Sequence, residues 1–143
     1  MDLVTDAAER HDGDLGEFFQ QLAGEISADY NTLTTLMATM GARGSGVKEV
    51  LAKAGSEIAE PKFSGDTTND PDFGTFLTLE TLSIGVEGKL CMWKALKAVE
   101  DDHQELKSAS IDKLVERAQS QRDRLEGKRL EFAPRALASK VNA

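Results

Sequence analysis

Six acidic side chains at helical spacing are the residues of this 143-residue chain that come closest to a chemical site: Glu25, Asp29, Glu57, Glu60, Glu80 and Glu87. A carboxylate di-metal site in a helical bundle needs a Glu from each of two helices and a Glu-x-x-His motif from each of the other two. In Glu57-Ile58-Ala59-Glu60 a glutamate stands where the histidine belongs, and no histidine follows His103. Because the ligand set is incomplete, we assign no metal ligand. The alternative is that these carboxylates flank apolar stripes and pair with Lys89 or with arginines of the last segment.

The remaining candidate groups do not form a catalytic set. His103 lies among acids in Asp101-Asp102-His103-Gln104-Glu105 and His11 lies near the start, but a lone histidine in a turn is more often exposed than a ligand. Cys91 has apolar neighbours, which predicts a buried, unreactive thiol in a reducing compartment. The chain shows no phosphate-binding glycine loop and no Gly-x-Ser-x-Gly motif. We therefore predict no catalytic residue, no cofactor and no enzymatic activity.

Aromatic side chains offer one further possibility. Trp93, with Met92 and Tyr30, could line a ligand pocket between helices. Aromatic residues at helical spacing are more often part of the core, and this is the interpretation we favour.

Four amphipathic segments must position these residues. Asp14 and Glu17 match a capping box, and apolar residues then recur every three or four positions from Leu15 to Met40, before a glycine-rich run at 41–46. Ser45 can cap a second helix, which Pro61 would end. The spacing thus predicts two helices, over 14–40 and 45–60.

Two more helices follow. Asp70-Pro71 combines a capping residue with proline at the first helical position, and the third helix should run to about Glu100. A fourth stripe runs from Ile111 to Leu137, where Pro134 should kink or end the helix. The chain is predicted to be all-α, an antiparallel four-helix bundle of either up-down-up-down or crossover topology. Residues 1–13 are predicted to be a loose acidic leader or a short extra helical turn, and residues 14–140 a single domain.

The third helix carries two apolar faces, so we expect it to be the most buried. One face holds Phe73, Leu77 and Ile84, and the other holds Leu79, Leu82, Val86, Leu90 and Trp93. Glycines inside the predicted helices, Gly24, Gly55, Gly85 and Gly88, suggest close approach of a neighbouring backbone, or else tolerated weak spots. Close packing predicts that Gly88→Leu lowers the melting temperature strongly.

Charge is divided unevenly along the chain. The net charge is −8, yet residues 1–102 hold 8 Lys/Arg against 19 Asp/Glu, whereas residues 103–143 hold 9 against 6. The acidic excess disfavours nucleic acid and anionic membranes as partners. No stretch is long and apolar enough for a membrane span and no export signal is recognisable, so we expect a soluble, cytoplasmic protein. The basic last helix should pack beside acidic neighbours.

One segment resembles a known group of proteins. The run from Leu79-Glu80-Thr81-Leu82 through Gly85-Val86-Glu87-Gly88 to Cys91-Met92-Trp93-Lys94-Ala95-Leu96 is similar to part of uncharacterised bacterial ferritin-like helical-bundle proteins, as is Lys62-Phe63-Ser64-Gly65. The resemblance covers about residues 15–137 and implies a ferritin-like four-helix bundle in a bacterial cytoplasm. It brings no activity with it, and this chain lacks the Glu-x-x-His motifs of the metal-binding members.

Three functions remain after these exclusions. The first is a non-enzymatic bundle that acts through a protein partner or homo-oligomer, because the third helix has a wide apolar surface and no catalytic set is present. The second is a degenerate carboxylate metal-binding protein that uses either Glu25 or Asp29 together with Glu57, Glu60, Glu80 and Glu87. The third is an acidic inhibitor or immunity-type protein that covers a basic partner.

Overall fold

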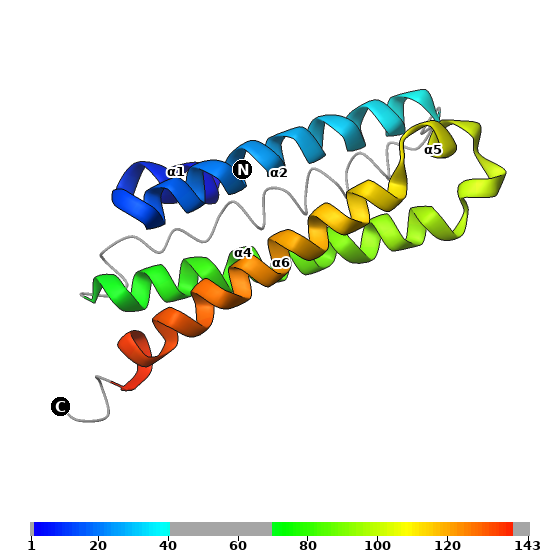
Figure 1. Ribbon diagram of the computed structural model, residues 1–143. Helices are drawn as coiled ribbons and strands as arrows, with labels where there is room; N and C mark the ends of the chain where they lie inside the picture. Colours follow the sequence, from blue (N-terminus) through cyan, green and yellow to red (C-terminus); the bar gives the residue numbers. More distant parts are fainter. Residues whose placement is uncertain (1, 41–69, 139–143) are drawn as a thin grey trace.

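The computed structural model describes residues 2–40 and 70–138, and these ranges are helical without a strand (Figure 1). The elements are α1 (Asp2–Arg10), α2 (Gly13–Thr39), α4 (Pro71–Ala98), η1 (Glu100–Asp102), α5 (Gln104–Ser108), α6 (Ile111–Ala133) and the π-helical turn η2 (Pro134–Ala138). The three long helices α2, α4 and α6 lie side by side, and α6 runs antiparallel to α4 after the turn formed by η1 and α5 (Figure 1). The all-α prediction is confirmed for this part of the chain. The predicted helix over 45–60 lies outside the described residues.

Helix α1 corrects the interpretation of residues 1–13 as a loose leader. Leu3, Val4 and Ala7 are buried in one cluster with Phe19 of α2 and with side chains of α4 and α6. Their spacing of one, three and four residues places them on one face of a helix. The first residues of the chain therefore contribute to the core.

His11 ties the end of α1 to α4. Its Nδ1 lies 2.8 Å from the carbonyl oxygen of Ala7, and its Nε2 lies 3.0 Å from Oγ1 of Thr75. Because a carbonyl only accepts, Nδ1 carries the proton, and in the neutral ring Nε2 accepts from the threonine hydroxyl. The ring also contacts Phe19, at 5.4 Å between centroids.

The start of α2 differs from the predicted capping box. The helix begins at Gly13, whose positive φ of 66° allows the chain to reverse after α1. Asp12 occupies the N-cap position without a side-chain cap bond, and Asp14 is an exposed residue of the first turn. The predicted cap at Asp14 is therefore wrong, although the helix end at 39–40 is confirmed.

Close backbone approach occurs at a glycine that the sequence did not single out. A Cβ on Gly16 would overlap the carbonyl oxygen of His11 and lie 2.9 Å from its carbonyl carbon. At Gly24 and Gly88 an added Cβ would meet no atom of the described residues within 4 Å, which contradicts the close-packing prediction at both positions. Gly55 lies outside the described residues, and at Gly85 the hypothesis stays a prediction.

Helix α4 begins as predicted. The Asp70 side chain accepts hydrogen bonds from the amides of Asp72 at 3.0 Å and Phe73 at 3.4 Å, and Pro71 follows in the first turn. The apolar face formed by Leu79, Leu82, Val86, Leu90 and Trp93 is buried throughout, as predicted. On the other face Ile84 is 69% exposed. Helix α6 ends at Ala133 because Pro134 follows, and the chain continues as one π-helical turn.

Two apolar clusters form the core, one towards each end of the long helices. The first joins α1, α2, α4 and α6–η2 around Phe19, Leu22, Leu79, Val86 and Leu125. The second joins α2, α4, α5 and α6 around Leu36, Leu90, Trp93, Leu106 and Leu114. The boundary between the clusters falls at the same level on all three long helices. No helix of the described residues is long and apolar enough to cross a membrane.

Candidate functional site

A layer of polar side chains separates the two apolar clusters. At the centre of this polar layer each long helix contributes one residue, Asp29 from α2, Lys89 from α4 and Gln121 from α6, and Glu25, Arg117 and Arg124 complete it. Asp29 is 2% exposed and Gln121 is fully buried. A buried carboxylate of this kind requires charge and hydrogen-bond partners, because its transfer from water is otherwise very costly.

Asp29 receives donors on both of its oxygens. Lys89 Nζ donates to Oδ2 at 2.7 Å and Gln121 Nε2 donates to the same oxygen at 3.2 Å. Arg117 Nη2 of α6 donates to Oδ1, and Lys89 Nζ also donates to Oε1 of Gln121. The carboxylate therefore binds α2 to both α4 and α6.

The network continues one turn along α2 to Glu25. Arg124 forms a two-pronged pair with this carboxylate, with Nη2 2.7 Å from Oε1 and Nη1 3.1 Å from Oε2. Gln121 Nε2 lies 3.1 Å from the same Oε1, so its amide links the Glu25 pair to Asp29. Two carboxylates thus meet three cations, Lys89, Arg117 and Arg124.

Burial shifts the titration of two members of this network. Burial by itself would raise the pKa of Glu25, but hydrogen bonds from Arg124 and Gln121 outweigh it, and the pKa lies below its ordinary value. Burial lowers the pKa of Lys89, although its bond to Asp29 opposes this change. In both cases the partners favour the charged form of the side chain, whereas burial disfavours it.

The arrangement is suited to joining helices rather than to binding a metal or activating a nucleophile. Every oxygen of Asp29 and Glu25 accepts at least one hydrogen bond from a cation or an amide. Among residues 2–40 and 70–138 no group of three or more His, Cys, Asp or Glu side chains is placed to hold a metal ion. The alternative that the acids pair with Lys89 and with arginines of the last helix is confirmed for the candidates that the structure describes.

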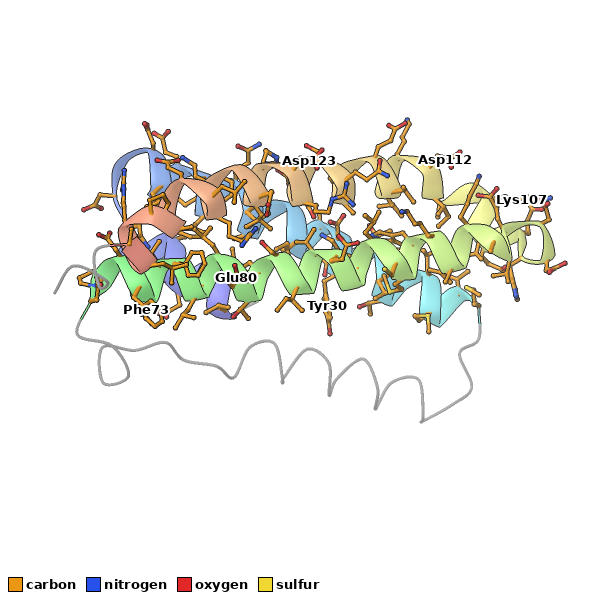
Figure 2. All side chains as sticks on the ribbon, turned by 90° about the horizontal axis from the view of Figure 1, so that it is seen from below. Tyr30, Phe73, Glu80, Lys107, Asp112 and Asp123 are labelled. Atoms are coloured by element: carbon orange, nitrogen blue, oxygen red, sulfur yellow. The ribbon has the colours of Figure 1, made fainter. Side chains whose placement is uncertain are left out.

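The other candidate carboxylates lie apart from the polar layer and have their own partners. Glu80 lies on the side of α4 that faces α6, where Arg129 Nη1 donates to its Oε1 at 2.6 Å (Figure 2). Arg129 also forms a pair with Glu126 of its own helix. Glu87 is exposed and lies 3.7 Å from Arg122. Glu57 and Glu60 lie outside the described residues, so of the six candidates the structure brings together Glu25 and Asp29.

Sequence reasoning missed Gln121 and Arg117, although a signal for Gln121 was present. The apolar stripe of the last helix steps from Ala118 to Leu125, and Gln121 fills the intervening position at three and four residues from them. A polar residue that interrupts a buried stripe is a candidate member of an interior network. Arg117 adjoins Ala118 and carried no comparable signal.

The cysteine, the aromatic residues and the second histidine that the sequence offered as candidate groups do not form a site together. Cys91 is exposed, so the predicted burial of its thiol is wrong. Tyr30 is exposed and points away from the helix layer, which excludes it from a pocket with Trp93 (Figure 2). Trp93 is fully buried, and its Nε1 has no hydrogen-bond partner in the described part of the chain. His103 precedes α5 without a side-chain cap bond.

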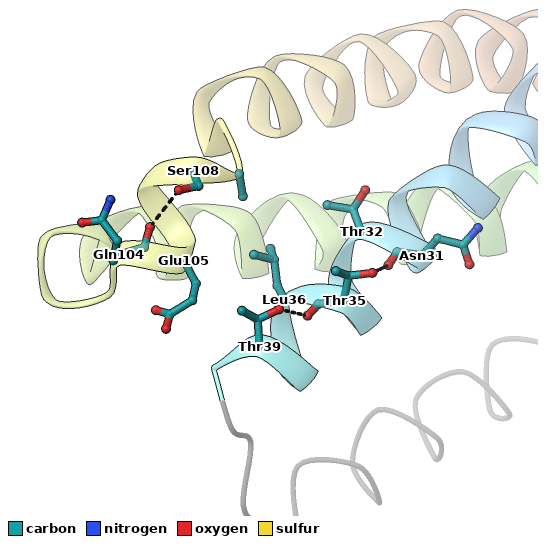
Figure 3. A pocket seen from close by; sticks show the side chains of 9 residues that line it. Asn31, Thr32, Thr35, Leu36, Thr39, Gln104, Glu105 and Ser108 are labelled. Carbon is teal, nitrogen blue, oxygen red and sulfur yellow. Dashed lines mark hydrogen bonds between the residues drawn. The ribbon is translucent and has the colours of Figure 1, made fainter.

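A pocket of about 590 Å³ opens between the second half of α2 and α5 (Figure 3). The α2 side chains are polar apart from Leu36, and α5 contributes one carboxylate. The lining residues are Asn31, Thr32, Thr35, Leu36 and Thr39 from α2, with Gln104, Glu105, Ser108 and Ala109 from the α5 segment. Its volume lies within the range of small-molecule sites.

Comparison with known proteins adds no relative: no family model, no curated protein and no solved structure matches this chain. The resemblance to ferritin-like helical-bundle proteins therefore stays a prediction from the sequence.

Proposed function

We propose that this chain is a non-enzymatic helical-bundle protein that acts through association, with a second copy of itself as the partner. One contrast supports the proposal. The candidate carboxylates that the structure describes are bound to lysine or arginine, whereas large apolar side chains of α2, α4, α6 and the segments that follow α4 and α6 remain in contact with water: Tyr30, Ile84, Val99, Leu130 and Leu137. Apolar side chains that the fold itself leaves uncovered favour association when they gather on one surface.

The topology of the bundle and the compartment of the protein are also part of this proposal. We propose an antiparallel, ferritin-like four-helix bundle in which residues 45–60 provide the remaining helix. The amphipathic pattern of that segment and the resemblance to ferritin-like helical-bundle proteins support it. The proposed compartment is a bacterial cytoplasm, for which the resemblance and the single unpaired thiol of Cys91 are the support.

The surface proposed for self-association lies at the end of α6–η2. Leu130 and Leu137 are both exposed there, seven residues apart, and residues 126–138 hold the cations Lys128, Arg129 and Arg135 against the two acids Glu126 and Glu131, with which they pair. The first 102 residues carry the acidic excess of the chain. The basic end of one copy can therefore meet an acidic surface of another, which lowers the repulsion that a net charge of −8 would otherwise produce.

Sedimentation equilibrium of the full chain over a wide concentration range tests this proposal. We expect concentration-dependent association of the wild type and its loss in Leu130→Glu/Leu137→Glu. The matched control is Gln20→Glu/Ala28→Glu, which adds the same charge at exposed positions of α2 and should associate as the wild type does. A wild type that stays monomeric at every concentration would contradict the proposal, and so would equal loss of association in both double variants.

A further inference from the structure

We infer that the pocket between α2 and α5 is a binding site for an aliphatic ammonium ligand, such as a linear diamine or polyamine. The inference rests on the arrangement of hydrogen-bond acceptors and charge around the pocket, and it is independent of the self-association proposed above.

The hydroxyl groups that line the pocket can act as hydrogen-bond acceptors for a ligand. Thr32, Thr35 and Thr39 donate their hydroxyl protons to carbonyl oxygens four residues earlier in α2, at 3.0, 2.9 and 2.6 Å. Ser108 does the same within α5, at 3.3 Å (Figure 3). A hydroxyl has one proton and two lone pairs, so each of these groups keeps acceptor capacity after its proton is used. The four oxygens suit a ligand that is rich in donors.

The one charged residue among those lining the pocket is negative. Glu105 is partly buried, and its carboxylate forms no ion pair or hydrogen bond with the residues that the structure describes. The carboxylates of the polar layer differ in this respect, because each of them is bound to a cation. Glu105 is therefore available as the counter-charge for a cationic ligand.

Acidic residues outnumber basic ones in the segment around α5, where Lys97 pairs with Glu100 and Lys107 lies 3.8 Å from Asp101. Residues 100–105, Glu-Asp-Asp-His-Gln-Glu, hold four acids and no lysine or arginine. The pocket also adjoins the last turns of α2, a helix whose final turn contains no basic residue, whereas α4 has Lys97 in its last turn. The C-terminal end of a helix carries partial negative charge, and a cation there is stabilised. An anionic ligand would meet opposition from both sources.

The shape of the lining favours an aliphatic ammonium ion over a bare metal ion. Leu36, Ala109 and the threonine methyl groups supply apolar surface beside the acceptors. An alkylammonium group has three donors and no acceptor, and its methylene chain can pack on such a surface. A hard metal ion needs several oxygens converging at short distance, and no such group of acidic side chains occurs in the described residues.

Titration of the full-length chain with spermidine, followed by isothermal calorimetry and by amide NMR shifts, tests the inference. We expect saturable binding with shifts centred on Thr35, Thr39 and Ser108. Glu105→Gln keeps the shape of the side chain and should weaken binding about fivefold, as loss of a partly exposed ion pair does. Glu116→Gln, which removes an exposed glutamate of α6 outside the pocket, is the matched control and should bind as the wild type does.

Three further ligands separate a built site from general attraction of cations. Putrescine should bind more weakly than spermidine, and 1,4-butanediol of the same chain length should not bind. Magnesium ion should not displace spermidine at equal ionic strength. Equal weakening by Glu105→Gln and Glu116→Gln, shifts spread over the acidic surface, or no binding at millimolar spermidine would each overturn the inference.

Discussion

Removal of the Asp29 carboxylate should destabilise the fold by more than the loss of its own contacts. In Asp29→Ala, Lys89 and Arg117 lose their shared anion. Arg117 is 37% exposed and can turn towards water, whereas Lys89 is 15% exposed and must keep most of its charge in the interior. Breaking a buried pair costs about 3–5 kcal/mol. Because one of the two cations can escape, we expect a loss of about 3 kcal/mol, and roughly a 10 °C lower melting temperature for a chain of this size.

Urea unfolding followed by helix circular dichroism measures this loss directly, with the slope m showing whether the transition stays two-state. The decisive variant is the double substitution Asp29→Ala/Lys89→Met. If a stranded ammonium group causes the loss, the double variant should be more stable than Asp29→Ala alone, because methionine fills similar volume without charge. A loss below about 1 kcal/mol in the single variant, or additive losses in the double variant, would refute the reasoning.

Three further predictions concern the glycines, the pH dependence and the thiol. Gly16→Ala should lower the free energy of unfolding, because the added Cβ would overlap the His11 carbonyl. Gly88→Ala should raise it by about 0.5–1 kcal/mol, because the Cβ has room and alanine favours the helix. Urea titrations of the two variants and the wild type measure both changes. Since the folded pKa of Glu25 lies below its ordinary 4.5, the stability that Glu25 adds is present above pH 4.5 and disappears as the pH falls through the folded pKa. The stability difference between wild type and Glu25→Gln should therefore shrink on acidification, and Arg124→Gln should reduce this pH dependence. Cys91 should react with a thiol reagent in the native protein as fast as in urea, and slow native labelling would show that it is covered.

Local capping chemistry made the start of α4 predictable. The Asp70-Pro71 pair determines the first turn through contacts within four residues, so no tertiary information is needed. The apolar face from Leu79 to Trp93 was predictable for a similar reason, because helical periodicity alone groups its members. The end of α6 at Pro134 follows from the missing amide proton of proline.

Cys91 and Tyr30 show where sequence reasoning failed. Cys91 was assigned to the core because its neighbours in sequence are apolar, but successive residues of a helix point about 100° apart. Leu90 is buried and Cys91 is exposed for this reason. Tyr30 follows the buried Asp29 by one residue and is turned outwards in the same way. The face of the helix on which a residue lies determines its burial, and the hydrophobicity of its neighbours in sequence does not.

The role of α1 and of Gly16 depended on tertiary contacts. The apolar residues of α1 span two turns, too short a pattern to separate a packed helix from a loose segment. Gly16 lies against the backbone of His11, and this contact exists because α1 folds back on α2. The four candidate carboxylates that the structure describes, Glu25, Asp29, Glu80 and Glu87, were predicted better, since the sequence already offered Lys89 and the arginines of the last segment as their partners.

The polar layer also limits how the helices can slide. On α6 the donors Arg117, Gln121 and Arg124 recur at four and three residues, and they face Glu25 and Asp29, which are four apart on α2. A slide of α6 by one turn, about 5.4 Å, would leave the bond from Lys89 of α4 to Asp29 in place, but it would break the present bond from Arg117 to Asp29 and the two-pronged pair between Arg124 and Glu25. If the interior were entirely apolar, the same slide would cost less free energy, because one apolar side chain of α6 would take the place of another against the same apolar surface. The charged pairs at the centre therefore favour the present register of the helices, and the apolar clusters on either side provide the burial that stabilises it.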